Sequence, residues 1–188
     1  PGEEGGNAVA RILFGEVVPS GKLTVSVPQS VGHVPVFYNH KPSGRGYYHR
    51  PGTPEKPGRD YVFASTDPLF PFGFGLSYTS FEYSDLKFRK KNLTDRDTME
   101  LSLKVRNTGA VSGKEVVQVY INDLISSVTT PVKVLKGFKK VSIKPGEITT
   151  LSFSIPCSEL GLWNKDMNYI IEPGEFEIMI GASAEDIR

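Results

Sequence analysis

The feature that most constrains the fold is a regular series of short alternating segments in the second half of the chain. Apolar and polar residues alternate in seven runs, at residues 81–88, 99–107, 114–122, 134–143, 148–155, 167–171 and 175–181. In the second run, Leu101, Leu103 and Val105 alternate with polar residues, which is the period of a strand with one buried face. Turn sequences separate the runs, among them Asn-Thr-Gly at 107–109, Lys-Pro-Gly at 144–146 and Glu-Pro-Gly at 172–174.

Seven strands of this spacing predict a mainly β fold, an immunoglobulin-like or fibronectin type III-like β-sandwich. Cys157 is the only cysteine, so an intramolecular disulfide framework and the Cys–Trp–Cys core of antibody domains are excluded. We interpret it as a semi-buried, inert thiol. Trp163 is the only tryptophan. It is predicted to fill the sandwich core, with an exposed platform for carbohydrate as the alternative.

The first 40 residues follow a different pattern. Asn7 is predicted to cap a helix over residues 8–14, which Gly15 ends. Residues 22–27 alternate with the period of a strand, which Pro28 ends. No sustained period follows from about 28 to 77, which predicts a long irregular loop. Residues 68–78 are rich in Phe, Leu, Pro and Gly, and we interpret them as a buried connector between two bodies.

Composition excludes several classes of protein and site. The 22 basic and 21 acidic residues leave a net charge of +1, so we expect neither nucleic acid nor a membrane as partner. No apolar run approaches the ~20 residues that span a bilayer. One cysteine and three histidines offer little for a metal site. The chain begins with Pro-Gly, in what is predicted to be a turn, and we therefore expect it to be a fragment or a processed piece.

Three short motifs are candidates for chemistry. The glycine-rich opening fits neither nucleotide-binding spacing, so we interpret it as a plain turn before the helix. Glu3 and Glu4 are adjacent and so cannot easily face each other across a sugar as a glycosidase pair does. The segment Tyr38–Arg45 combines Asn, His, Lys and Arg donors with aromatic residues, a composition that binds sugars. An exposed loop of mixed charge is more often solvated or braced against a neighbouring domain.

The order of the motifs resembles one enzyme family. The resemblance is carried by PGEEGGNAVARILFGEVVPSGKL, then VPVFYNHKPSGR, then PLFPFGFGLSYTSFEYSDL, and covers essentially the whole chain. These blocks are similar to the C-terminal part of family 3 glycoside hydrolases, and within that family to the bacterial periplasmic β-glucosidase type. The downstream blocks GKEVVQVYIND, PVKVLKGFKKVSIKPGE and LWNKDMNYIIEPGEFEIMIGASAED resemble the fibronectin type III-like domain that ends those enzymes.

The resemblance implies a division of the chain and of the chemistry. Residues 1–40 are expected to close an α/β sandwich domain, 41–78 to form a loop and connector, and 79–188 to form the fibronectin type III-like sandwich. The parent enzyme is expected to be a retaining, exo-acting β-glucosidase that removes terminal β-D-glucosyl residues. Its nucleophilic Asp and acid/base Glu are expected upstream, so no catalytic residue is assigned here. Glu4 is taken as architectural.

The resemblance also implies what this chain contributes and binds. It is expected to be structural, inactive alone, and to lend loop residues to the active-site rim, with Asn39, His40, Lys41, Arg45 and Tyr47 as the substrate-rim or interdomain candidates. Its expected partners are the upstream catalytic domains, on the same or a nicked chain, a β-glucoside or oligosaccharide, and a second copy in a homodimer. No cofactor or metal is implied. The alternative is a non-catalytic carbohydrate-binding or adhesion module.

Overall fold

The structure, a computed structural model, describes residues 2–42 and 67–188. Its regular elements, in chain order, are α1 (Gly5–Leu13), β1 (Phe81–Phe88), β2 (Thr98–Asn107), β3 (Gly113–Asp123), β4 (Val134–Ile143), β5 (Ile148–Pro156), the 3-10 helix η1 (Cys157–Leu160), β6 (Leu162–Trp163), β7 (Tyr169–Ile170) and β8 (Phe176–Gly181). The fold is mainly β, as predicted. Among the described residues, no helix has the length and apolar character to cross a membrane.

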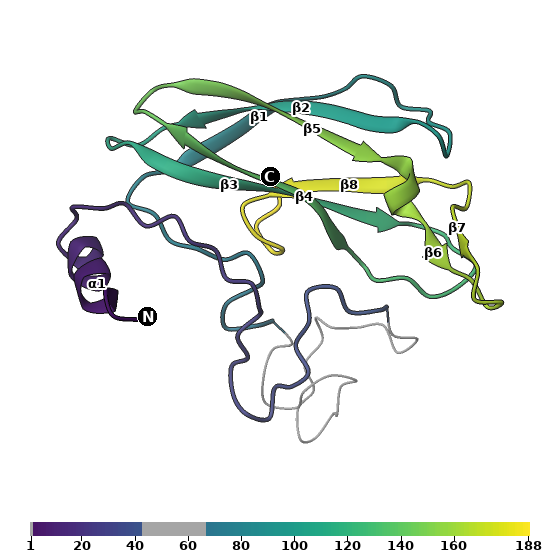
Figure 1. The fold of residues 1–188 in the computed structure, drawn as a ribbon, viewed down its shortest axis with the longest axis horizontal. Helices are drawn as coiled ribbons and strands as arrows, with labels where there is room; N and C mark the ends of the chain where they lie inside the picture. The colour runs from purple at the N-terminus through teal and green to yellow at the C-terminus, as the bar shows by residue number, and fades with distance from the viewer. Residues whose placement is uncertain (1, 43–66) are drawn as a thin grey trace, which may run out of the picture.

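Two three-stranded antiparallel sheets stack to form a sandwich (Figure 1). One has the order β1-β2-β5 and the other β4-β3-β8, while β6 and β7 form a separate two-residue hairpin. β1 and β4 coincide with their predicted residues, and β2, β3, β5 and β8 differ from theirs by a residue or two at the ends. The sixth predicted run shortens to β7, and β6 was not predicted.

The sandwich core is made by the inward faces that the alternation predicted. Leu101, Leu103 and Val105 of β2 are buried against Val117 and Val119 of β3. Burying an aliphatic side chain of this kind contributes about 1.5–3 kcal/mol. These contacts between the sheets therefore form the core of the sandwich.

The predicted turn after β2 is held by a buried asparagine. Asn107 donates from Nδ2 to the carbonyls of Val111 (2.8 Å) and Ile143 (2.9 Å). Its Oδ1 accepts from Thr79 Oγ1 at 2.6 Å and from the Gly109 N–H at 3.0 Å. The turn residues therefore connect β2, the following loop and the segment that enters β1.

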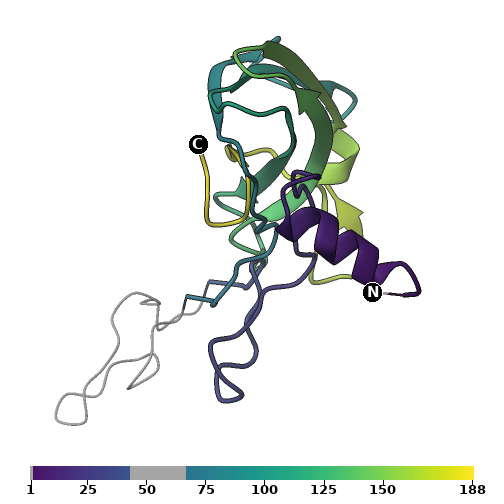
Figure 2. The ribbon, with the colours of Figure 1, turned by 90° about the vertical axis from the view of Figure 1, so that its left-hand side faces the viewer.

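The N-terminal helix lies beside the sandwich and begins earlier than predicted (Figure 2). Its N-cap is Glu4, and the predicted cap Asn7 lies inside the first turn, where its side-chain amide donates to the Glu4 carboxylate at 2.6 Å. The assignment of Asn7 as the cap was therefore wrong. Gly15 has a φ of +78° just beyond the helix, so the predicted stop is confirmed.

Residues 22–27 do not form the regular strand that was predicted. They run antiparallel to residues 69–75, and we call these two segments together the ribbon. Leu23 exchanges backbone hydrogen bonds with Phe74 and Gly73, both 2.8 Å, and Val27 forms an isolated bridge with Phe70. The ribbon brings together the two ends of the loop 28–68. Leu69 and Leu76 are 54% and 70% exposed, so residues 68–78 are not buried within this chain as predicted.

Candidate functional site

Among the described residues, the contact between the ribbon and the sandwich joins the N-terminal half of the chain to the C-terminal half. Gln118 of β3 is buried and donates from Nε2 to the carbonyls of Gly73 (3.2 Å) and Ala182 (2.6 Å). Its Oε1 accepts from Tyr120 Oη at 2.5 Å. One amide side chain thus joins the ribbon, β3 and the segment after β8.

The ribbon approaches Gln118 so closely that only glycine fits at position 73. Gly73 has a φ of +80°, and a Cβ there would lie 2.2 Å from the Oε1 atom of Gln118. Next to it, the Phe72 carbonyl accepts from the Ala184 N–H at 2.9 Å. The ribbon is therefore bonded to the sandwich through its backbone carbonyls, at Phe72 and Gly73.

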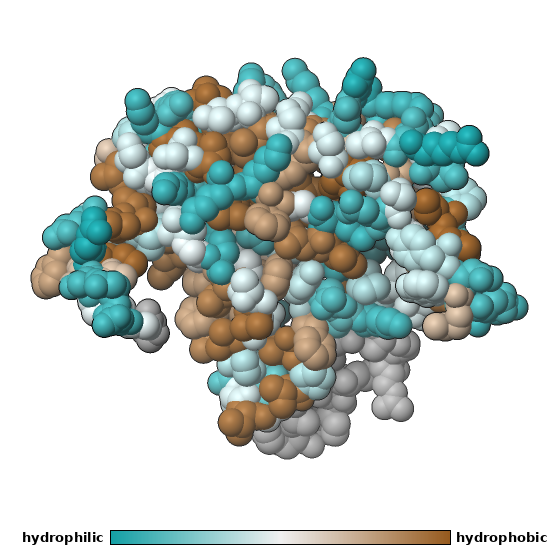
Figure 3. All heavy atoms as spheres, in the orientation of Figure 1, coloured by the Kyte–Doolittle hydropathy of each residue, from teal (hydrophilic) through white to brown (hydrophobic). Residues whose placement is uncertain are grey.

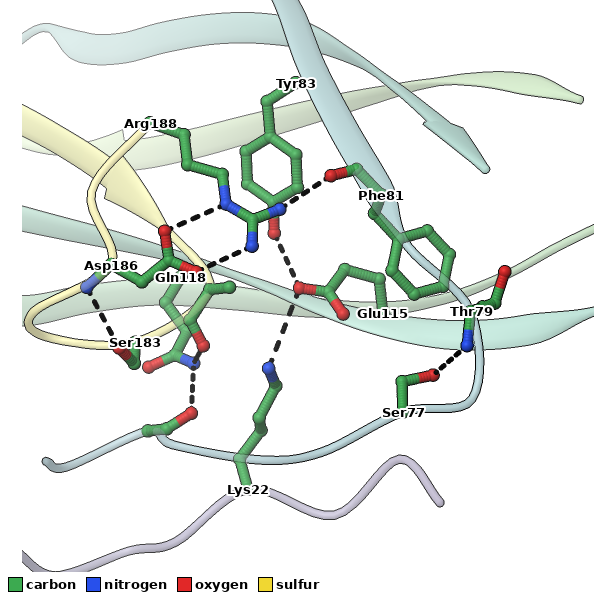
Figure 4. Close-up of polar contacts among 12 residues, drawn as sticks. Lys22, Ser77, Thr79, Phe81, Tyr83, Glu115, Gln118, Ser183, Asp186 and Arg188 are labelled. Atoms are coloured by element: carbon green, nitrogen blue, oxygen red, sulfur yellow. Dashed lines mark hydrogen bonds and ion pairs between the residues drawn. The ribbon is translucent and has the colours of Figure 1, made fainter. Parts of the chain in front are cut away.

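A charged cluster holds the other segment of the ribbon (Figure 4). Lys22 Nζ lies 3.7 Å from Glu115 Oε1, and Tyr83 Oη donates to the same oxygen at 2.9 Å. Glu115 on β3 is only 5% exposed. Burial, and secondly the adjacent Glu115 carboxylate, raise the pKa of Tyr83, so the phenol stays protonated as a donor. Lys22 supplies the positive charge that a buried carboxylate requires.

The C-terminal residue completes this cluster. Arg188 forms a bidentate contact with Asp186, at 3.0 and 2.6 Å, and donates to the Phe81 carbonyl at 2.8 Å. Its guanidinium also lies 5.0 Å from the ring centroid of Tyr83. The hydrogen bond from Arg188 lowers the pKa of Asp186. The tail is thus fixed against β1, beside the residues that hold Lys22.

The start of the loop is anchored on the sandwich by an aromatic contact. Tyr38 stacks on Phe72 with centroids 4.2 Å apart and meets Tyr120 edge-on at 5.8 Å. The Tyr38 hydroxyl accepts from the Leu135 N–H at 3.3 Å, and the His40 carbonyl accepts from the Val132 N–H at 3.0 Å. These contacts give residues 38–40 a defined position against β3 and the start of β4.

The structure places three of the five predicted rim residues. Asn39 is exposed, His40 is half-buried, and Lys41 is exposed and lines a hollow beside Trp163. Arg45 and Tyr47 lie outside the described residues. Glu115 and Gln118 were not predicted as site residues, although one signal was present: these polar residues interrupt the apolar run of β3, whose two faces are both buried.

Two lone residues have different outcomes. Cys157 is buried and burial raises the pKa of its thiol, which favours the interpretation as an inert cysteine. Trp163 is 60% exposed, so its prediction as the core residue was wrong. It belongs to the short hairpin outside the two sheets, where no core position is available. In the ranges 2–42 and 67–188, no three metal-ligating side chains converge.

Two protein-family models match the chain. Residues 1–78 match the glycosyl hydrolase family 3 C-terminal domain, and residues 115–184 match the fibronectin type III-like domain. The chain is 44% identical over 190 residues to a periplasmic beta-glucosidase of Salmonella typhimurium, covering all of this chain and 24% of the relative. It is 44% identical over 193 residues to a beta-xylosidase of Formosa agariphila, covering all of this chain and 25% of the relative.

A solved structure agrees with these relatives. The crystal structure of a beta-glucosidase from Listeria innocua in complex with glucose superposes with a TM-score of 0.88 at 36% identity, covering all of this chain and 26% of that one. The chain thus spans about a quarter of the length of the relatives that it matches.

Proposed function

The chain is the C-terminal part of a family 3 glycoside hydrolase, and we propose that it braces the catalytic domains of a retaining, exo-acting β-glucosidase. The whole enzyme would remove terminal β-D-glucosyl residues through a covalent intermediate on two carboxylates. Both carboxylates would lie on upstream domains, on the same polypeptide or a nicked one. The relatives include a beta-xylosidase as well as beta-glucosidases, so the sugar preference depends on residues of the upstream pocket.

The observation that carries this proposal is the set of polar contacts between the sandwich and the ribbon. Gln118 and Glu115 of β3 bind Gly73 and Lys22, one from each segment of the ribbon. A free-standing sandwich has no need for such contacts to an extended segment that precedes it by many residues. They are expected where the sandwich fixes the end of another domain and the loop that leaves it.

The N-terminal half carries the apolar surface that a catalytic domain would cover. Leu13 and Phe14 at the end of α1 are 73% and 84% exposed, and Val25 and Phe37 are also exposed. Figure 3 shows apolar residues gathered on the lobe below the sandwich. We assign residues 1–40 to the end of an α/β domain, 41–78 to the loop and connector, and 79–188 to the sandwich. The exposed side chains would pack against the rest of the α/β domain.

The loop is the part of this chain that we assign to the active-site rim. Its candidate residues are Asn39, His40, Lys41, Arg45 and Tyr47. The support is the anchoring of residues 38–40 by Tyr38, because a rim residue needs a rigid base to orient a substrate. The homodimer expected from the resemblance stays a prediction that gel filtration tests.

The direct experiment is to assay the purified 188-residue chain on an aryl β-glucoside. We expect no turnover, because the chain holds neither catalytic carboxylate. Each fraction across the gel-filtration peak should be assayed, so that a contaminating hydrolase is separated from the chain. Turnover that follows the chain through the column would overturn the proposal that this part is structural.

A further inference from the structure

A hollow outside the ribbon contact has the features of a binding site. It has a volume of about 490 Å³ and lies between the loop before β4, the start of β6 and the anchored segment at Lys41. This volume falls within the range of about 300–1,000 Å³ that is typical of small-molecule sites. Apolar side chains and the rings of Trp163 and Phe176 line it, together with acidic, basic and hydroxyl groups from Asp123, Lys136, Lys41, Thr129 and Thr130.

The aromatic ring is exposed but held in a fixed position. Trp163 pairs with Tyr169 in the β6–β7 hairpin, and the two rings meet edge-on with centroids 5.5 Å apart. Tyr169 Oη donates to the Ser158 carbonyl at 2.9 Å. A Cβ at Gly161 would lie 2.6 Å from the Tyr169 ring, so glycine lets that ring support Trp163. An indole that is 60% exposed and rigidly supported offers a flat apolar platform at little entropic cost.

The polar groups beside the platform are also held in place. Lys136 Nζ donates to the Glu159 carbonyl, and Thr130 Oγ1 pairs with Ser126 Oγ at 3.2 Å. Asp123 is half-buried at the end of β3. Burial, and to a lesser degree the charge of Glu172, raise the pKa of Asp123. The Lys136 ammonium has three donors and the Asp123 carboxylate about four acceptor sites, so both can form further hydrogen bonds with a ligand.

The chemistry of this lining favours a neutral polyhydroxylated ligand. Trp163 can cover an apolar face, because the electron-rich face of an indole attracts the weakly positive C–H groups of a sugar ring. The carboxylate and the ammonium groups can pair with hydroxyls, which donate and accept at once. Charges of both signs line the hollow, so a strongly anionic or cationic ligand would meet a like charge.

We propose that this hollow binds an oligosaccharide, with one sugar ring stacked on Trp163 and its hydroxyls bonded to Asp123 and Lys136. The site is formed mainly by residues of the sandwich, and Lys41, one of the rim candidates, also lines it. The choice of β-linked glucose as the probe rests on the proposed function. The proposal of a binding site rests on the geometry of the hollow and is independent of that function.

The test uses the fact that Trp163 is the only tryptophan of the chain. Its fluorescence is recorded while cellotetraose, and separately maltotetraose, is titrated into the 188-residue chain. We expect a saturable shift of the emission to shorter wavelength with cellotetraose. Saturation with maltotetraose alone would support the site and contradict the β-linked choice. The absence of a saturable change with both sugars, in a chain that circular dichroism shows to be folded, would overturn the site.

Two variants locate the binding, measured by calorimetry. Trp163→Ala should weaken cellotetraose binding at least about tenfold, and Asp123→Asn about tenfold. The matched control is Phe138→Ala, which removes another exposed aromatic side chain, on β4 and outside the lining of the hollow, and should leave binding unchanged. Equal binding by Trp163→Ala and the unmutated chain would refute the proposal. The bracing function would be unaffected, because none of these residues contacts the ribbon in the described contacts.

Discussion

The contact between Lys22 and Glu115 allows a quantitative test of how the sandwich holds the ribbon. At an effective dielectric constant of about 20, charges 3.7 Å apart attract by about 4–5 kcal/mol. Lys22→Met keeps the aliphatic stem and removes the charge. Part of the lost attraction is recovered, because the methionine has no ammonium to desolvate and Arg188 remains nearby. We therefore expect the free energy of unfolding to fall by about 2–3 kcal/mol, which corresponds to a loss of about 5–10 °C in the melting temperature.

The assay is urea unfolding followed by circular dichroism, with Lys104→Met as the matched control. Lys104 lies closer to its partner Asp85, at 2.7 Å, but both side chains are about half exposed. Exposed pairs contribute at most about 1 kcal/mol, so the shorter pair should matter less. In a Glu115→Gln background, the effect of Lys22→Met should shrink. Equal costs for the two lysine variants, or an unchanged Lys22 effect in that background, would refute the reasoning.

Three further predictions concern the polar contacts and the exposed surface. Gln118→Ala leaves three hydrogen-bond partners unpaired and should lower the free energy of unfolding by about 3–5 kcal/mol. The control Gln29→Ala removes an amide that makes one exposed hydrogen bond and should cost about 1 kcal/mol or less. Similar costs for the two variants in denaturant unfolding would contradict this prediction. Hydrogen bonds from the Thr94 N–H, then from Lys90 and the Thr94 hydroxyl, lower the pKa of Asp97 to about 2 from its usual 3.8. The ionised Asp97 therefore stabilises the fold fully above about pH 5, and this stabilisation is lost as the pH falls toward 2. The melting temperatures of Asp97→Asn and the unmutated chain should therefore converge between pH 4 and pH 2, and a constant difference would contradict the assignment. The chain should bind a hydrophobic dye through residues 1–40, and Phe14→Ser should reduce the fluorescence of the bound dye; a chain that leaves the dye dark would count against an uncovered apolar face.

The strands could be predicted because their information is local. β2 was predicted to within one residue, because its alternating burial appears as a period in its own sequence. β1 and β4 coincide with their predicted residues. β6 has two residues, which is too short for any period to appear. The partner of residues 22–27 was also invisible, because the bonds from Leu23 and Val27 go to residues more than 40 positions later. Such a pairing leaves no trace in a local pattern.

The candidate site was only partly predictable for a related reason. The polar composition of residues 38–45 left both a contact and a solvated loop open, and the structure shows that Tyr38 and His40 are bonded to the sandwich. Glu115 and Gln118 carry the ribbon contact, yet in the sequence they are single polar residues in an apolar strand. Their meaning depends on Lys22 and Gly73, which reach them only through the fold.

The central claim is that the sandwich holds the ribbon in a fixed position, and hydrogen exchange of the ribbon amides tests it most directly. The N–H groups of Leu23, Val27, Leu69 and Gly73 all donate within the ribbon. We predict that they exchange slowly, as the amides of β3 do, and that Gln118→Ala accelerates them while the β2–β5 ladder stays protected. Exchange of these four amides at the rate of an unstructured chain, beside a protected sandwich, would contradict the account.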